Sequence, residues 1–299
     1  MNKVLKAVSL YLCVISLATY QMPSIAADFL ATRYQSELYA LEQPFLIMQH
    51  KRNYFLPLSY MVDLNENVSI VTDEVGLTHE EAKYQVSLKA PIYLWGTDNG
   101  NNALEGFYAG LSLKAYGQFY NSKLSEPIRE NNYEIETYYS WRPDWSWRQH
   151  QVYSLNLGLN HYSNGKSDIY SRSWNRIIAT MTVDSGAWYS SLSIWFRIPE
   201  QQKSDPNQAN GDDNPDITNY MGYFEYTAGT KVSIYSLEAT VRNNLNINKN
   251  KYYIELNLSL PINQRFDALL QYVNGYGESL IDYDFKMERI GIGFQFKYL

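Results

Sequence analysis

A histidine, a serine and an asparagine that could form a nucleophilic site lie close together in the sequence, at His161, Ser163 and Asn175. A serine hydroxyl attacks a carbonyl only when a base removes its proton, and the base needs a third group that fixes its tautomer. Asn175 can accept the imidazole N–H, although it cannot stabilise an imidazolium as a carboxylate would. These residue types predict nucleophilic catalysis if their side chains share one face.

Alternation of apolar and polar residues places the three side chains on one face. In the run 150–162 the odd positions are apolar, and His161 and Ser163 continue that row. In the run 174–183 Asn175 begins the apolar row. Residues two apart in a strand share a face, so all three side chains project from the apolar side of one hairpin.

Alternating runs of this kind recur along the whole chain. We count about twelve, many near the roughly 9–11 residues that a tilted strand needs to cross a bilayer. From the second run onward, short turns mostly alternate with long connections, as in outer-membrane barrels. The sequence therefore predicts an all-β fold, a twelve-stranded antiparallel transmembrane β-barrel. The runs lie near 45–60, 84–95, 104–120, 133–142, 150–162, 174–183, 187–198, 218–228, 231–242, 251–261, 265–274 and 288–298.

A soluble β-sandwich is the competing fold. Its core strands also alternate, but they are usually shorter, and its loops show no alternation between two rims. Gly, Lys and Gln on the second face of the runs favour a barrel with a polar interior. After residue 26 no stretch reaches the roughly 18 apolar residues of a membrane helix.

The N-terminus has the order of a secretory signal peptide. Lys3 and Lys6 precede an apolar run and a small-residue site that ends at Ala26, which predicts a signal peptide over 1–26. The single cysteine, Cys13, lies within it, so we expect a cysteine-free barrel over 27–299. Residues 27–43 are expected to be a loosely ordered segment.

Charge excludes one class of partner. Removing 1–26 removes two lysines and no acids, which moves the formal net charge from −6 to −8. An acidic chain without a basic run is a poor candidate for binding nucleic acid.

In a barrel, the apolar row that carries the candidate site faces lipid. Any one of the three polar residues could lie among headgroups at little cost, but three on one face favour a site whose substrate is the lipid itself. Acyl-ester hydrolysis develops an oxyanion, for which the backbone N–H of Gly165 is available. The Ser- and Asp-rich loop suits a hard cation such as Ca²⁺. Counting strands from a periplasmic N-terminus places this loop on the extracellular side.

The block HYSNGKSDIYSRSWNR resembles the signature of outer membrane phospholipase A. The likeness extends to RENNYE at 129–134, DDNPDITNYMGY at 212–223 and GYGESLIDYDF at 275–285. The resemblance implies a calcium-dependent acyl hydrolase on a twelve-stranded barrel in the outer membrane of a Gram-negative bacterium. It implies His161 as base, Ser163 as nucleophile and Asn175 as the third member of the triad.

The resemblance also implies a calcium ion at the interface of a homodimer. The ligands would be the carbonyl of Lys166, where the family has Arg, and the Ser171 hydroxyl from one chain, with Ser125 from the other. Asp213 would match a calcium ligand of the monomer, and Asp168 is a further candidate for the same site.

Two other functions stay open on the sequence alone. The barrel could be a passive channel with an incidental Ser/His pair, although Arg176, Trp195, Arg197 and Lys297 point inward by parity and would fill a pore. A soluble secreted lipase is the third possibility.

Overall fold

A computed structural model describes residues 29–43, 46–68, 75–95, 103–186, 188–205 and 211–297. The signal peptide expected over 1–26 lies outside these ranges. In the described part of the chain, no helix is long and apolar enough to cross a bilayer.

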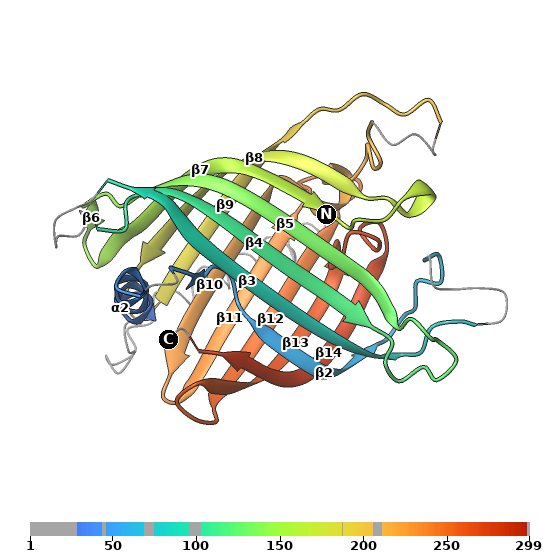
Figure 1. Cartoon of the computed structure of the whole chain (residues 1–299), viewed down its shortest axis with the longest axis horizontal. Helices are drawn as coiled ribbons and strands as arrows, with labels where there is room; N and C mark the ends of the chain where they lie inside the picture. Colours follow the sequence, from blue (N-terminus) through green and yellow to red (C-terminus); the bar gives the residue numbers. More distant parts are fainter. Residues whose placement is uncertain are drawn as a thin grey trace, which may run out of the picture.

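Twelve long antiparallel strands close into a barrel (Figure 1). Each strand pairs with the next along the chain, and β14 pairs with β2, so none of the long strands in the described ranges is left with an open edge. Closure satisfies the backbone N–H and C=O groups, which an open sheet in lipid could not do. The two-residue strands β1 and β6 add to this ring by pairing with β3 and β7. The strands are β1 (Met48–Gln49), β2 (Tyr54–Met61), β3 (Glu80–Leu94), β4 (Gly106–Gly117), β5 (Ile128–Trp141), β6 (Ser146–Trp147), β7 (His150–Ser163), β8 (Ser173–Asp184), β9 (Trp188–Ile198), β10 (Phe224–Val232), β11 (Tyr235–Asn243), β12 (Tyr252–Pro261), β13 (Phe266–Tyr276) and β14 (Lys286–Phe296).

The sequence-based strands match this ring, with two local differences. The run expected at 218–228 begins with the short helix α3 (Thr218–Met221), and strand β10 starts only at Phe224. The run expected at 45–60 is interrupted between β1 and β2. Alternation alone did not reveal either break.

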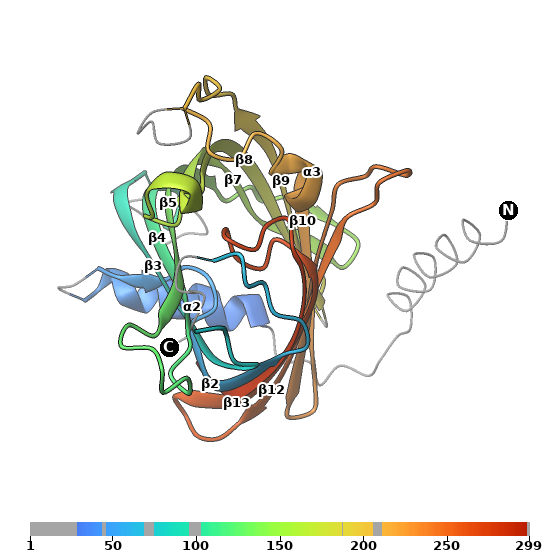
Figure 2. The same cartoon turned by 90° about the vertical axis from the view of Figure 1, so that its right-hand side faces the viewer.

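The N-terminal segment is a helix and not a loosely ordered stretch. Helix α2 (Phe29–Leu41) lies inside the ring of strands, at the end opposite the β7–β8 loop (Figures 1 and 2). Its Glu37 side chain is buried and pairs with Lys89 at 2.7 Å and Arg142 at 3.1 Å. The expectation for 27–43 is thus wrong over the helix, because ion pairs and apolar contacts with the inner wall hold it in place.

Six charged side chains form a buried cluster inside the barrel, which we call the interior charge cluster. Its three cations and three carboxylates are each at most 1 % exposed and are joined by contacts of 2.7–3.0 Å. Buried charges remain in a protein only when paired in this way. The members are Glu81, Lys83, Arg129, Glu278, Asp282 and Arg289.

Candidate active site

The pairing of β7 with β8 brings the three predicted catalytic residues to one patch of the outer wall. His161 lies opposite Asn175 in the register, and Ser163 lies opposite Ser173. The same face carries Leu157, which is 60 % exposed, so the row faces the surroundings of the barrel. Polar side chains at the end of such a row are costly in lipid and point to a site.

A hydrogen bond joins the predicted base to the predicted third member. His161 Nδ1 and Asn175 Oδ1 are 2.9 Å apart, so the amide oxygen accepts from Nδ1–H, and in the neutral imidazole this leaves the lone pair on Nε2. Ser163 lies two residues farther along β7 on the same face, and its hydroxyl has no hydrogen bond among the described residues. Catalytic hydrogen bonds are often long in the free enzyme and shorten when substrate binds.

Glu200 extends this row and was not found from the sequence. Asn175 Nδ2 donates to Glu200 Oε1 at 3.0 Å, just beyond the end of β9. We call Ser163, His161, Asn175 and Glu200 the outer polar row. A lone glutamate in the polar stretch PEQQKSD carries no periodic signal, so only the folded pairing of β8 with β9 places it here.

The loop that follows Ser163 is organised by the buried side chain of Asn164. Asn164 Oδ1 accepts from the N–H of Arg172 at 2.9 Å, and Nδ2 donates to the carbonyl of Tyr170 at 2.9 Å. Gly165 has φ of +65°, and a Cβ there would lie 3.2 Å from the Tyr133 ring, so the turn requires glycine. The predicted oxyanion donor thus sits in a fixed turn two residues after the predicted nucleophile.

Two of the predicted calcium ligands are in direct contact. Ser171 Oγ donates to Asp213 Oδ2 at 2.8 Å, and Ser173 Oγ donates to the same atom at 3.2 Å. The other carboxylate oxygen of Asp213 pairs with Lys203, a residue of the long 199–212 connection. A built-in ammonium group therefore already neutralises this carboxylate.

The remaining predicted ligands are more widely spread. Ser125 is exposed in the β4–β5 loop, and Asp168 begins the 3-10 turn η2 (Asp168–Tyr170). Lys166 Nζ lies 3.9 Å from Glu130, and burial lowers the pKa of this lysine although Glu130 opposes the shift. Across the ranges that the structure describes, no three His, Cys, Asp or Glu side chains cluster as a metal site.

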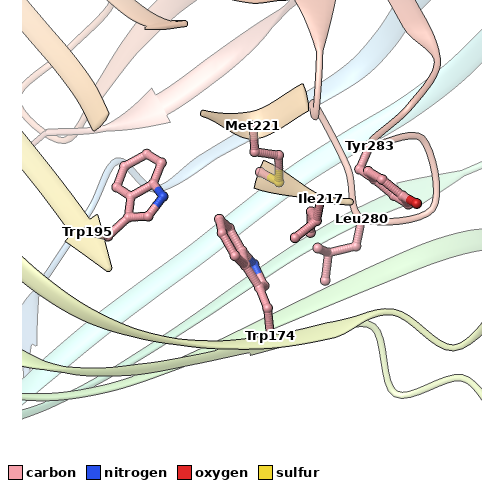
Figure 3. Packing of buried hydrophobic residues seen from close by; sticks show 6 residues of the cluster. All are labelled: Trp174, Trp195, Ile217, Met221, Leu280 and Tyr283. Carbon is pink, nitrogen blue, oxygen red and sulfur yellow. The ribbon is translucent and has the colours of Figure 1, made fainter. Parts of the chain in front are cut away.

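The β7–β8 wall is supported from inside the barrel by residues of the motifs at 129–134, 212–223 and 275–285. Leu280 N donates to Asn132 Oδ1 at 3.0 Å, and the Tyr283 hydroxyl donates to Asp216 at 2.7 Å. Figure 3 shows the apolar cluster behind β8 and β9, where residues from α3 and the β13–β14 loop meet Trp174 of β8. Residues of these motifs therefore brace the wall that carries His161, Ser163 and Asn175. The cluster consists of Trp174, Trp195, Ile217, Met221, Leu280 and Tyr283.

Comparison with known proteins gives a consistent picture. The model of the family "Phospholipase A1" matches residues 30–296. The phospholipase A1 of Klebsiella pneumoniae is 34% identical over 277 residues, which covers 92% of this chain and 90% of that protein. The phospholipase A1 of Escherichia coli K12 is 32% identical over 275 residues, covering 92% and 88%.

Solved structures are similar over the same range. The outer membrane phospholipase A of Escherichia coli superimposes with a TM-score of 0.75 at 32% identity, covering 85% of this chain and 100% of that chain. The Salmonella typhi outer membrane phospholipase dimer with bound calcium gives a TM-score of 0.77 at 31% identity, covering 88% and 98%. An active-site mutant of the Escherichia coli protein, in which an asparagine is replaced by alanine, gives 0.76 at 31% identity, covering 90% and 97%.

Proposed function

The chain belongs to the phospholipase A1 family of the Gram-negative outer membrane, whose members are carboxylic ester hydrolases, and on that premise we propose that Ser163, His161 and Asn175 carry out the hydrolysis. The 2.9 Å bond between His161 Nδ1 and Asn175 Oδ1 is the observation that carries this assignment. The asparagine named as an active-site residue of the Escherichia coli protein supports the role of Asn175.

The chemistry follows from the positions of the three side chains. His161 Nε2 takes the proton of Ser163 as Oγ attacks the ester carbonyl of a phospholipid, and it then gives that proton to the departing lysophospholipid. Asn175 holds the imidazole in the Nδ1–H tautomer. The N–H of Gly165 donates to the oxyanion. Water activated by His161 then releases the fatty acid from Ser163.

Calcium fits the oxygen donors beside this row. Its ligands would be the Lys166 carbonyl and the Ser171 hydroxyl, with Ser125 from a second copy of the chain, and Asp213 or Asp168 in the monomer. When bound, calcium would stabilise negative charge that develops on the oxyanion. The contact of Ser171 Oγ with Asp213 Oδ2 at 2.8 Å supports a hard-cation site here.

A homodimer is the active form that we propose. The wall around the site presents large apolar side chains, including Leu157 and Ile135 at 60 % and 55 % exposure. A second copy could cover this wall, complete the calcium site with Ser125 and form a groove for the acyl chain. The calcium-bound dimer of the Salmonella typhi relative supports this assembly.

The inside of the barrel gives little support to a passive channel. The interior charge cluster and α2 occupy it, and a cavity of about 360 Å³ within the ring is lined mostly by charged and polar side chains. Ion pairs thus cross the lumen where solutes would have to pass.

The test is fatty-acid release from a phospholipid by the refolded chain, with calcium or with a chelator. Ser163→Ala should abolish the calcium-dependent release, whereas Ser146→Ala, an exposed serine of β6 near the opposite rim, should leave it unchanged. Release that survives Ser163→Ala would reject the site. Failure of a folded dimer to release any fatty acid would reject the function and make ion conductance the next measurement.

A further inference from the structure

The side-chain amide of Asn175 is held at both ends. Its Oδ1 faces His161 Nδ1 at 2.9 Å, and its Nδ2 donates to Glu200 Oε1 at 3.0 Å. Asn175 pairs with Ile198 in the β8–β9 register, and Glu200 lies two residues beyond Ile198. In extended chain, residues two apart lie on the same side, which brings the carboxylate to the outer wall beside Asn175.

The two ends of an amide are chemically different, and this makes the Glu200 contact directional. An ionised carboxylate only accepts hydrogen bonds, so it must face the NH₂ end of Asn175. The carbonyl end is then turned to His161 and can accept only from Nδ1–H. That tautomer leaves the lone pair of Nε2 for the serine proton.

We propose that Glu200 is a positioning residue of the Ser163–His161–Asn175 triad, whose carboxylate fixes the orientation of the Asn175 amide and, through it, the tautomer of His161. This inference rests on the proposed function. Glu200 also places a negative charge two hydrogen bonds away from the imidazole, where it stabilises the positive charge that develops on His161 during proton transfer.

The arrangement also explains why position 175 carries an amide and not an acid. An aspartate there would place a second carboxylate at hydrogen-bond distance from Glu200, and two like charges at that distance disfavour each other. Glu200 thus supplies the negative charge that an aspartate supplies in other triads, but it acts across the Asn175 amide and does not contact the imidazole directly.

Rates of ester hydrolysis test this role, measured with short-chain phosphatidylcholine in mixed micelles at saturating calcium. Glu200→Ala should lower kcat about 10-fold with little change in KM, the effect expected when a partner that orients a functional imidazole is removed. Glu200→Gln can still accept from Asn175 Nδ2 but carries no charge and can also present its own NH₂ end, so its kcat should lie between those of Glu200→Ala and the unchanged protein. Gln201→Ala changes the exposed neighbouring side chain and should leave both constants unchanged.

A double-mutant cycle separates positioning from a general structural effect. In an Asn175→Ala background, Glu200→Ala should change kcat less than about 2-fold, because the residue through which it acts is gone. An equal loss of kcat in both backgrounds would overturn the proposal, as would an unchanged kcat in Glu200→Ala alone.

A charge-swap pair gives an independent result. Asn175→Asp should lower kcat, and adding Glu200→Gln should restore most of the loss by removing the like charge. Failure of the second substitution to restore activity would contradict the contact. Ser163→Ala belongs in the same series: if it stays active the proposed function fails, whereas an inactive Ser163→Ala beside a fully active Glu200→Ala rejects only the role of Glu200.

Discussion

The two faces of the barrel wall hold polar groups in opposite ways. Inside, each carboxylate of the interior charge cluster meets one or two cations, and the side chains are sealed from solvent. Outside, the outer polar row is a single chain of contacts that runs from Glu200 to His161 and leaves the Ser163 hydroxyl at its end. The paired charges of the interior charge cluster stabilise the fold, whereas the outer polar row leaves the Ser163 hydroxyl available to a substrate.

Among substitutions on either face of the wall, His161→Ala should have the largest effect, and it should act on catalysis alone. We expect kcat to fall by about 10⁴-fold or more, because loss of the base disables the triad as a unit. The free energy of unfolding should stay within about 0.5 kcal/mol, since the side chain is exposed. Fatty-acid release and urea unfolding in bilayers measure the two quantities.

His150→Ala, near the opposite rim of the barrel, is the matched control and should leave kcat unchanged. More than about one hundredth of the activity remaining in His161→Ala would contradict the assignment of the base.

Arg289→Met should act on stability alone. It leaves the buried Glu278 and Glu81 without one of their cations, which costs about 3–5 kcal/mol when one partner of a buried pair is removed. The kcat of the folded fraction should not change. Arg265→Met removes an exposed arginine from the β12–β13 turn and should cost no more than about 0.5 kcal/mol. Equal stability of the two variants would show that the interior charge cluster does not hold the barrel together.

Asp213→Asn should weaken the binding of calcium. Fewer charged ligands weaken calcium binding, so we expect the calcium concentration for half-maximal activity to rise about 10-fold. Chelation should abolish activity but leave the unfolding midpoint almost unchanged, because the site lies at the rim. Asp144→Asn, an exposed acid at the other rim, serves as the control. An unaltered calcium dependence in Asp213→Asn would remove Asp213 from the ligand set.

Lys203→Met should have the smallest effect and the opposite sign. The ammonium group of Lys203 pairs with the Asp213 carboxylate and competes with calcium for it. Removing this competitor should therefore raise the calcium affinity, and by less than Asp213→Asn lowers it. Calcium titration of the intact protein by calorimetry measures the change, and weaker binding would show that Lys203 assists the site.

The sequence predicted the barrel well because alternation is a local property that a transmembrane strand must show along its whole length. It also brought His161 and Asn175 together, since the parity of two adjacent strands sets the face of each side chain. Helix α2 was missed although Leu30, Tyr34, Leu38 and Leu41 follow a helical spacing. A segment with mixed polarity becomes ordered only through partners elsewhere, such as the Lys89 that neutralises Glu37.

Contacts between distant polar residues were the least predictable part of the site. Glu200 reaches Asn175 and Lys203 reaches Asp213 from a connection that has no periodic pattern. Which of several nearby charges makes such a contact depends on the path of the loop, and the loop path depends on the finished barrel.

The pairing of β14 with β2 has a consequence for biogenesis. The first and last long strands of the described chain are neighbours in the ring, so the ring stays open until β14 reaches β2. Until then β2 and β13 expose unpaired backbone, which lipid does not tolerate and which other chains can bind. Closure of the ring as the last step of its assembly is therefore built into this strand order.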